Sequence, residues 1–284
     1  MKPILKWAGG KARLATQIDF AFGDGCVGRY YEPFMGSAAV FLYRRAHRRV
    51  GPAVLADVNA KLVEVHRAVR DDVDGILDAL ARMPVTDWKE RYHEMRDAYN
   101  EGPFEGVEHA ARFVWLNRAC YNGLYRENRA GKFNVPVGSY ARLSVPSAEH
   151  FRGVSELMRG VELVSAGFEE VMGLAGAGDQ IYCDPPYVPL SATANFTGYS
   201  SEPFALREQR ALARAAEGAA DAGARVVISN HDLPLVRDEL YPVGQGYRYI
   251  SAPMVSRAIS QQGGTRSAVA EVIAAIGPNL HRAA

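Results

Sequence analysis

Two short apolar segments with a helical segment between them constrain the fold of this chain more than any other feature. Residues 29–34 and 53–56 are apolar runs of strand length, and residues 38–45 between them have the pattern of a helix. Two strands joined through one helix form a βαβ unit, in which the strands are parallel and the crossover is right-handed. The sequence therefore predicts an α/β sheet that begins in the first part of the chain.

The alternation of strand and helix is interrupted once and then resumes. From residue 59 to about residue 119 the apolar residues recur at helical spacing, and the Gly-, Asn- and Pro-rich stretch 121–140 is typical of a hairpin with loops. Strand-like runs return at 161–165, 180–183, 225–229, 247–251 and 268–276, with helices near 205–222 and 233–240. We therefore expect one sheet with a mainly helical insertion, divided as residues 1–58, 59–146 and 147–284.

Composition narrows the class of protein. Of the 284 residues 48% are hydrophobic and 23% are charged, as in an ordinary globular protein, and the net charge of +1 gives no general attraction to nucleic acid. Cys26, Cys120 and Cys183 lie far apart without the spacing of a metal site, which favours a reduced compartment and no bound metal. Since no long apolar segment occurs, we expect a cytoplasmic protein that does not contact membranes.

The tetrapeptide Asp184-Pro185-Pro186-Tyr187 follows the apolar run 180–183, and so lies at the carboxyl end of a strand, where α/β sheets bind ligands. An exocyclic amine on a nucleobase is a poor nucleophile because its lone pair is delocalised into the ring. A carboxylate from Asp184 and a carbonyl from Pro185 could each accept one amine hydrogen and free the lone pair, while Tyr187 stacks on the base. The alternative is a proline-rich turn with a capping Asp and a surface Tyr.

The segment 31–39 (YEPFMGSAA) follows the first strand and opens the first helix, as expected for a loop that lets a cofactor approach the backbone. It lacks the G-x-G-x-x-G pattern of a dinucleotide site. Asp57 ends the second strand at the spacing of a residue that binds a ribose diol, although it could also cap the next helix.

The segment 6–11 (KWAGGK) is not a phosphate-binding loop, because Ala12 stands where a Ser or Thr is required. Trp7 and its flanking lysines could instead clamp a carboxylate-bearing ligand or line a nucleic-acid groove. The alternative is a terminal Trp that covers the edge of the sheet.

Positive charge is concentrated in one part of the chain. Residues 112–152 contain seven basic and two acidic residues, a net charge of +5, interleaved with aromatic and Asn residues. That mixture suits phosphate contacts, readout of base edges and wedging of a duplex, although a solvated basic face is the alternative.

Together these segments resemble the Dam-type DNA adenine-N6 methyltransferases, over nearly the whole chain and in the order of that family. The matching segments are 6–11 (KWAGGK), 32–36 (EPFMG), 55–57 (LAD), 116–118 (LNR), 121–124 (YNGL), 133–136 (FNVP), 182–187 (YCDPPY), 190–197 (LSATANFT), 229–232 (SNHD) and 263–266 (GGTR). The resemblance implies a Rossmann-like class I methyltransferase sheet, with residues 59–146 as an inserted DNA target-recognition domain that carries a hairpin. It also implies S-adenosylmethionine as methyl donor, double-stranded DNA as partner, GATC as target and a monomer without an obligate protein partner.

The resemblance further implies roles for individual residues. Catalysis would rest on Asp184, Pro185, Pro186 and Tyr187, and the cofactor would contact Trp7, Lys11, Glu32, Phe34, Gly36, Asp57, Phe168 and Asp184. Tyr121 looks like the intercalating residue and Asn122 like the one that faces the orphaned thymine. Readers of the outer base pairs would be Leu124, Arg126 and Pro136, and readers of the first guanine Lys6 and Tyr140. Further DNA contacts are expected from Arg118, Asn128 and Asn134.

The chain departs from the family pattern at a few positions. Ala38 stands where the second glycine of F-x-G-x-G is usual, Ser139 stands where relatives can carry a phosphate-binding Arg, and Gln261 and Gln262 replace a more usual Ser-Asn pair. Two other functions compete with the expected one: a methyltransferase of the same fold acting on RNA or a protein amide, and a non-catalytic DNA-binding relative. The recognition insertion argues against the first, and the intact Asp184, Tyr187, Asp57 and Lys11 argue against the second.

Overall fold

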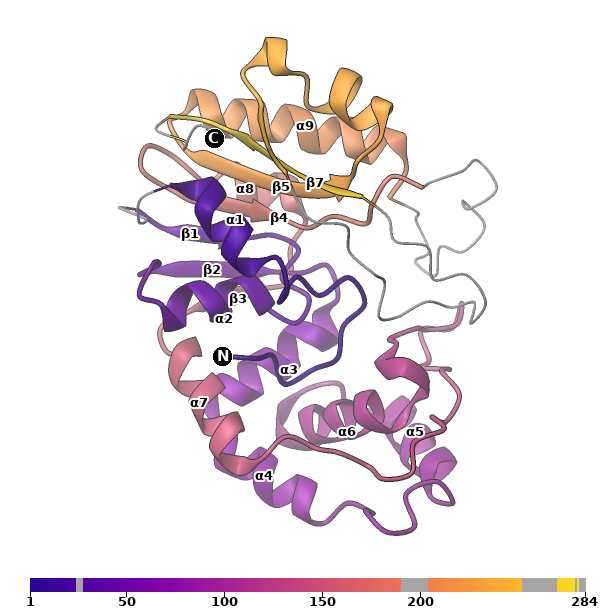
Figure 1. Ribbon diagram of the computed structural model, residues 1–284. Helices are drawn as coiled ribbons and strands as arrows, with labels where there is room; N and C mark the ends of the chain where they lie inside the picture. Colours follow the sequence, from indigo (N-terminus) through magenta and orange to yellow (C-terminus); the bar gives the residue numbers. More distant parts are fainter. Residues whose placement is uncertain (24–27, 190–203, 252–269, 279, 281–284) are drawn as a thin grey trace.

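The computed structural model describes residues 1–23, 28–189, 204–251, 270–278 and 280 (Figure 1). The strands are β1 (Tyr30–Glu32), β2 (Ala53–Ala56), β3 (Glu162–Val164), β4 (Gln180–Cys183), β5 (Arg225–His231), β6 (Arg248–Ser251) and β7 (Glu271–Ile276). The α-helices are α1 (Ala15–Phe22), α2 (Ala39–Ala46), α3 (Ala60–Asp71), α4 (Val73–Ala81), α5 (Tyr92–Glu101), α6 (Gly106–Ala119), α7 (Ala148–Met158), α8 (Phe168–Met172) and α9 (Leu206–Asp221). Short helical segments are η1 (Tyr121–Gly123), η3 (Leu235–Leu240, a π-helix) and η4 (Val243–Gln245).

The seven strands form one sheet in the order β3-β2-β1-β4-β5-β7-β6. Strands β1 to β5 are parallel to one another, while β7 is antiparallel to both β5 and β6. From β1 the chain builds outward to β2 and β3 on one side, and later to β4 and β5 on the other. The order therefore reverses between β1 and β4, and the carboxyl edge at that reversal is where such sheets bind their ligands. The prediction of a Rossmann-like α/β sheet is confirmed.

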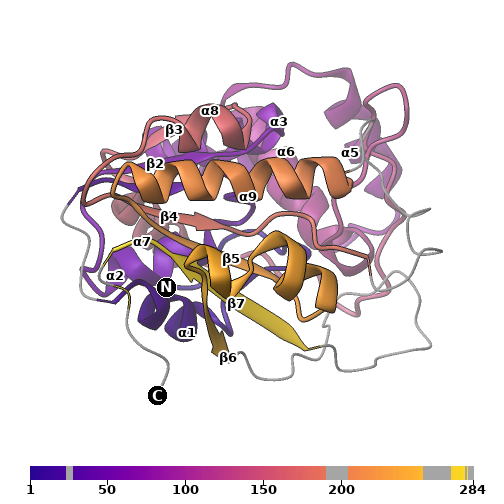
Figure 2. The ribbon, with the colours of Figure 1, turned by 90° about the horizontal axis from the view of Figure 1, so that it is seen from above.

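Alternate residues along the strands enter two separate hydrophobic cores, as the pleat requires. On β5, Val227 packs in one core and Val226 and Ile228 pack in the other; on β4, Tyr182 and Ile181 divide in the same way. Helices α1 and α2 contribute to the first core and α8 and α9 to the second, so both faces of the sheet are covered (Figure 2).

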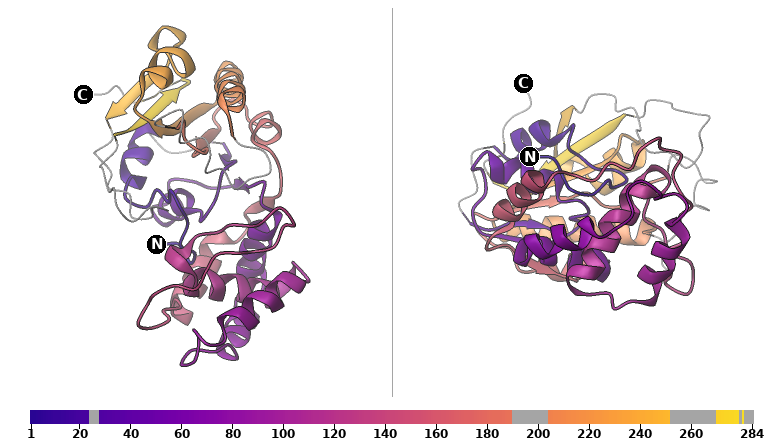
Figure 3. Two further views of the ribbon diagram at one scale, coloured as in Figure 1. Left: turned by 90° about the vertical axis from the view of Figure 1, so that its right-hand side faces the viewer. Right: turned by 90° about the horizontal axis from the view of Figure 1, so that it is seen from below.

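Residues 59–146 contribute helices α3 to α6 and η1, which lie below the sheet in Figure 1 and form a distinct lobe in Figure 3. Helix α6 packs against α3, α4 and α5. The expected hairpin appears as two isolated antiparallel bridges, Cys120 with Val137 and Glu127 with Phe133. Helix α7, from the next expected division, packs on α3 and α4, so the two parts share helix contacts. The division at residues 58 and 146 stays a prediction.

Helices α1, α7 and α8 are not predicted by the sequence pattern. Helix α8 has only five residues, too few to display a helical period. Helix α7 does begin with a recognisable cap, because the Ser147 hydroxyl accepts from the backbone N–H of His150 at 3.2 Å.

Candidate active site

One large cleft lies at the carboxyl edge of the sheet, where β1 and β4 are neighbours. Its volume is about 1310 Å³, more than the ~300–1,000 Å³ usual for a single small ligand, so it has room for two ligands. All residues that the sequence predicts to bind the cofactor or to act in catalysis line it: Trp7, Lys11, Glu32, Phe34, Gly36, Asp57, Phe168, Asp184, Pro185, Pro186 and Tyr187. The fold thus brings together side chains that lie far apart in the sequence, while their individual roles stay predictions.

The turn after β1 approaches Trp7 closely. Gly36 has φ +46°, and a Cβ there would lie 2.7 Å from the Trp7 ring, so only glycine fits without displacement. Two residues later Ala38 adopts φ 57° and ψ 31°, the left-handed region that glycine enters without strain. The departure at Ala38 from the glycine usual in the family therefore places an alanine in a strained backbone.

Asp57 follows β2 directly and connects the turn after β1 to the start of α3 by hydrogen bonds. Its two carboxylate oxygens accept from the backbone N–H groups of Gly36 at 3.1 Å and Asn59 at 3.0 Å. Burial raises the pKa of Asp57, and these two hydrogen bonds oppose the rise. The helix cap of α3 is Asn59, which accepts from Leu62 N–H at 3.1 Å, so the alternative of Asp57 as the cap is wrong. Each Asp57 oxygen keeps a free lone pair for a further donor.

Asp184 is paired with a buried lysine. The Lys11 ammonium lies 3.1 Å from its carboxylate, with Lys11 6% exposed and Asp184 19% exposed. Burial raises the pKa of Asp184, Lys11 opposes this rise and the Glu271 carboxylate adds to it. Lys11 also lies over the Tyr187 ring, 4.7 Å from its centroid. The cation thus holds the carboxylate and the aromatic face in one arrangement.

Tyr187 is partly buried and does not match the alternative of a surface Tyr. Its hydroxyl donates to Glu271 at 3.1 Å, and its ring meets the His231 ring edge-on at 4.8 Å between centroids. Burial raises the pKa of Tyr187 well above its usual value, so the hydroxyl remains a donor. Glu271 and His231 both line the cleft, and neither is among the predicted site residues.

Glu32 lies buried at the end of β1, with 2% of its surface exposed. Burial raises its pKa to about 8, the hydrogen bond from the Tyr30 hydroxyl at 2.7 Å opposes the shift, and the charge of Asp184 adds to it. At neutral pH this carboxyl group therefore carries a proton.

Aromatic rings form one wall of the cleft. Phe34 stacks on Phe168 at 5.6 Å between centroids, and Phe204 meets both edge-on, at 5.7 and 5.8 Å. Phe204, just before α9, is a further lining residue that the sequence pattern does not identify.

The described residues that line the cleft include five acidic and two basic side chains. They are Glu32, Asp57, Asp184, Glu208 and Glu271, against Lys11 and Arg13. With Glu32 protonated, the other four carboxylates still exceed the two cations, and this excess in a partly desolvated cleft favours a ligand that carries positive charge.

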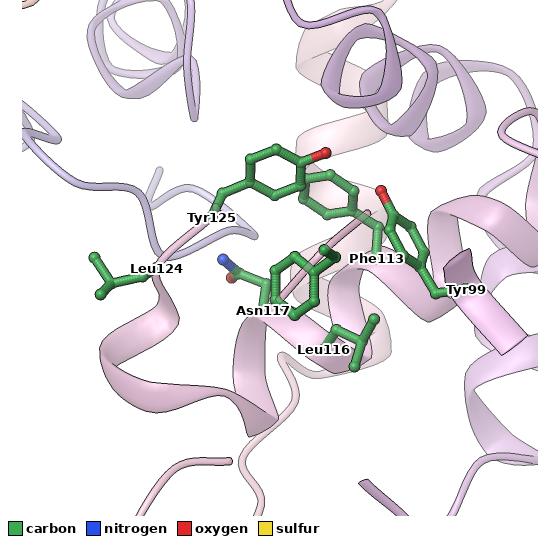
Figure 4. A pocket seen from close by; sticks show the side chains of 7 residues that line it. Tyr99, Phe113, Leu116, Asn117, Leu124 and Tyr125 are labelled. Atoms are coloured by element: carbon green, nitrogen blue, oxygen red, sulfur yellow. The ribbon is translucent and has the colours of Figure 1, made fainter. Parts of the chain in front are cut away.

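Trp7 connects the cleft to the insertion. Its indole stacks on Tyr125 at 5.7 Å and on Phe113 at 6.4 Å, and Tyr125 stacks on Phe113 at 5.1 Å. Figure 4 shows Tyr125 and Phe113 of this cluster near the Asn117 side chain. That amide accepts from Lys6 N–H at 2.8 Å and donates to the Lys6 carbonyl at 2.7 Å. The alternative of a Trp that merely covers the sheet edge is therefore wrong.

The predicted DNA-contacting residues form two groups, and those of the second group have hydrogen-bond partners within the protein. In the first group, Tyr121, Asn122, Leu124 and Tyr140 are partly buried and Pro136 is exposed. The Lys6 ammonium lies 4.2 Å from the centre of the Tyr140 ring.

Four others have partners within the insertion or nearby. The Arg126 guanidinium donates to the Asn134 side chain at 2.6 Å and to its carbonyl at 3.0 Å, while Arg118 donates to the Ile4 carbonyl. The Asn128 side chain accepts from two backbone N–H groups of its own turn, at 2.9 and 3.1 Å. Arg118 and Asn128 thus stabilise the local structure through these hydrogen bonds. Their contacts with DNA stay predictions.

Comparison with known proteins identifies the family. Residues 7–243 match the family described as D12 class N6 adenine-specific DNA methyltransferase. The chain belongs to this family. It is 37% identical over 284 residues to the DNA adenine methylase of Escherichia coli (strain K12), covering 98% of this chain and 96% of that protein. It is 38% identical over 286 residues to the DNA adenine methylase of Salmonella typhi, with the same coverage, and 33% identical to the type II methyltransferase M.MjaIII of Methanocaldococcus jannaschii, covering 81% of this chain and 84% of that protein. The chain is therefore an adenine-specific DNA methyltransferase.

Two further observations concern the described residues alone. Their helices include none that is both long and apolar enough to cross a membrane. Within the same ranges no group of three or more His, Cys, Asp and Glu side chains is arranged to hold a metal ion. Cys26, the segments 190–197 and 263–266, Gln261 and Gln262 lie outside the described residues.

Proposed function

We propose that this enzyme transfers a methyl group from S-adenosylmethionine to N6 of adenine in double-stranded DNA, at GATC sites, by flipping the base and by direct in-line transfer. The observation that carries the proposal is the Lys11–Asp184 pair, which lies beside two prolines and an aromatic ring in a cleft large enough for two ligands. The specificity for GATC follows from the resemblance in the recognition segment.

The cleft residues fit this methyl donor. When bound, S-adenosylmethionine would supply an electrophilic methyl group on a positively charged sulfur. Asp57 retains lone pairs that can accept from a ribose diol, Phe34 and Phe168 present aromatic surface, and the carboxylates favour the positive charge of the sulfonium. Trp7, Lys11, Glu32 and Gly36 line the same space.

The catalytic loop would act by accepting hydrogen bonds. The Asp184 carboxylate and the Pro185 carbonyl would each accept one hydrogen of the adenine amine, which turns the nitrogen lone pair out of the ring. Tyr187 would stack on the flipped base, and Asp184 would favour the positive charge that develops on nitrogen in the transition state. The proton leaves to water after transfer. Lys11 keeps the carboxylate in place while donating to it.

Residues 59–146 would form the DNA target-recognition domain. Tyr121 would intercalate, Asn122 would face the orphaned thymine, and the readers of base pairs would be Lys6, Leu124, Arg126, Pro136 and Tyr140. Further contacts would come from Arg118, Asn128 and Asn134. Helix α6, which orders this segment, is tied to the cleft through Trp7 and Asn117. We expect the enzyme to act as a monomer in the cytoplasm.

The specificity is tested by expressing the enzyme in a host without adenine methylation and digesting its plasmid with nucleases that distinguish methylated from unmethylated GATC. Complete protection at GATC is expected. Methylated adenine found only in other sequences would contradict the specificity.

The role of Asp184 is tested with Asp184→Ala. We expect methyl transfer to fall by at least ~10²-fold, since a preorganised group at the reacting atom is lost, while DNA affinity stays within a few-fold of the parent. Transfer of labelled methyl groups and filter binding measure the two quantities. An equal loss of both would remove Asp184 from the proposed role.

A further inference from the structure

A buried series of hydrogen bonds between side-chain amides connects α9 and β5 to the loop that carries Asp184-Pro185-Pro186-Tyr187. Gln209 of α9 is 1% exposed and donates through Nε2 to the Pro186 carbonyl at 2.7 Å. Its Oε1 accepts from Nδ2 of Asn230 at 3.1 Å, and Asn230, at the end of β5, is fully buried. Asn230 Oδ1 in turn accepts from the Val188 backbone N–H at 3.1 Å. The chain of hydrogen bonds therefore begins and ends on the loop, on the two sides of Tyr187.

The orientation of both amides is determined by the groups at the two ends. A backbone N–H can only donate, so the Asn230 atom that faces Val188 must be the oxygen, and its nitrogen faces Gln209. A carbonyl can only accept, so the Gln209 atom that faces Pro186 must be the nitrogen. The two requirements agree, and each amide satisfies its partner without conflict.

His231 supports the same stretch of backbone. Its ring Nδ1 lies 2.6 Å from the Val188 carbonyl and must carry the hydrogen, because the carbonyl accepts. Its backbone N–H donates to Asn230 Oδ1 at 2.9 Å. Val188 is thereby held through both its N–H and its carbonyl.

The loop needs such support because of its prolines. Proline fixes φ but not ψ and has no N–H, so neither Pro185 nor Pro186 can anchor the backbone by donating. The direction of the Pro185 carbonyl is set by ψ of Pro185. Pro186 confines ψ of Pro185 to the extended region, because the ring of a proline restricts the residue before it. Within that region the angle is held from both sides: by the Lys11–Asp184 pair before it and by the hydrogen bond to the Pro186 carbonyl after it.

We propose that Gln209 is a positioning residue for methyl transfer, which, together with Asn230, holds the loop so that the Asp184 carboxylate and the Pro185 carbonyl face the adenine amine. The inference deepens the proposed function and rests on it. Gln209 does not touch the reacting atoms, and its effect on the rate is transmitted through the Pro186 carbonyl.

The test compares Gln209→Glu with the parent enzyme and with Gln245→Glu, which makes the same change at an exposed position. In Gln209→Glu the new carboxyl group cannot donate to the Pro186 carbonyl when it is ionised, but it can when it is protonated, while its other oxygen still accepts from Asn230. We expect kcat at pH 8.5 to fall about tenfold to a hundredfold, the range for a misplaced reacting geometry, and to return toward the parent value at pH 6. The KM for donor and the Kd for DNA should stay within about twofold, and Gln245→Glu should match the parent.

A second variant removes the dependence on charge. Gln209→Met keeps the length of the side chain and its preference for helix but cannot donate, so kcat should fall at both pH values without recovery. Both variants are assayed at a temperature where their circular dichroism spectra match that of the parent, and donor binding is measured separately by calorimetry. A parent-like kcat in Gln209→Met, or a loss in Gln209→Glu that is the same at pH 6 and 8.5, would overturn the proposal.

The Asp184→Ala variant separates this inference from the proposed function. If Asp184→Ala retains transfer, the assignment of the loop fails and the inference fails with it. If Asp184→Ala is inactive while both Gln209 variants match the parent, only the positioning role of Gln209 is wrong.

Discussion

Replacing Glu32 by Gln should change how the stability of the protein depends on pH. Glu32 is 2% exposed, and burial raises its pKa from an ordinary 4.5 to about 8. Below pH 4.5 the group is protonated in both the folded and the unfolded chain, so it does not make the free energy of unfolding depend on pH. Between pH 4.5 and 8 only the unfolded chain releases the proton, so the free energy of unfolding falls as pH rises.

The magnitude follows from the shift of the pKa. Each pH unit in this interval removes about 1.4 kcal/mol from the free energy of unfolding, which gives a loss of about 3 kcal/mol at pH 7 and about 5 kcal/mol above pH 8. Gln has nearly the shape of Glu, carries no proton to lose, and keeps an oxygen that accepts from the Tyr30 hydroxyl. Glu32→Gln should therefore be more stable than the parent by under about 1 kcal/mol at pH 5 and by about 3 kcal/mol at pH 7.

Urea unfolding of the parent and Glu32→Gln from pH 5 to 9 measures this difference directly. Other groups with a shifted pKa occur in both proteins, so their contributions to the pH dependence of stability cancel when the two are compared. Glu162→Gln, at an exposed position, controls for the loss of one acidic group and should give a small difference at every pH. A difference between Glu32→Gln and the parent that is constant from pH 5 to 9 would refute the reasoning.

The same shift links Glu32 to the proposed methyl donor. A cation bound in the cleft would stabilise ionised Glu32 and lower its pKa, so donor binding below pH 8 should release a proton. Calorimetry in two buffers with different ionisation enthalpies should detect that proton with the parent enzyme but not with Glu32→Gln.

Two further predictions concern the turn after β1. Gly36→Ala places a Cβ 2.7 Å from the Trp7 ring at φ +46°, so we expect the free energy of unfolding to fall by about 1–3 kcal/mol in thermal unfolding and the donor to bind more weakly. Gly51→Ala, where a Cβ meets nothing within 4 Å, should be neutral, and equal losses in the two variants would contradict the steric explanation. Ala38→Gly relieves the strain of the left-handed backbone at φ 57°, so it should cost less stability than Ala39→Gly, the same change in the first turn of α2, where glycine costs about 1 kcal/mol. An equal cost at both positions in thermal unfolding would show that Ala38 is unstrained.

Much of the fold follows from the local sequence. Strand β2 begins and ends where its apolar run does, because buried parallel strands are continuously apolar. Strand β4 also has the expected bounds, although it begins with the buried polar residue Gln180. Cleft residues that directly follow such strands, such as Asp57 and Asp184, can be placed at the carboxyl edge without knowledge of the tertiary structure. Their meeting in one cleft then follows from the parallel arrangement.

Glu271 shows why other cleft residues escape the sequence pattern. It is the first residue of β7 and pairs with His231, the last residue of β5. Because β7 is antiparallel, its start lies at the same edge as the ends of the parallel strands. Predicting that Glu271 reaches Tyr187 therefore requires the direction and register of β7, which depend on long-range pairing. Gln209 is similar, since the polar face of a helix gives no indication that one amide turns inward to a distant loop.

The segment 6–11 has a wider part in the structure than its composition suggests. At one end the Lys6 backbone pairs with Asn117 of α6, in the middle Trp7 stacks on Tyr125 and limits the Gly36 turn, and at the other end Lys11 pairs with Asp184. Six consecutive residues thus contact the insertion, the turn after β1 and the loop that holds Asp184. A displacement of α6 would act on Lys6 and Trp7, and through this short segment on the Lys11 cation that pairs with Asp184. The segment is therefore a direct physical connection between the insertion and the Asp184 carboxylate.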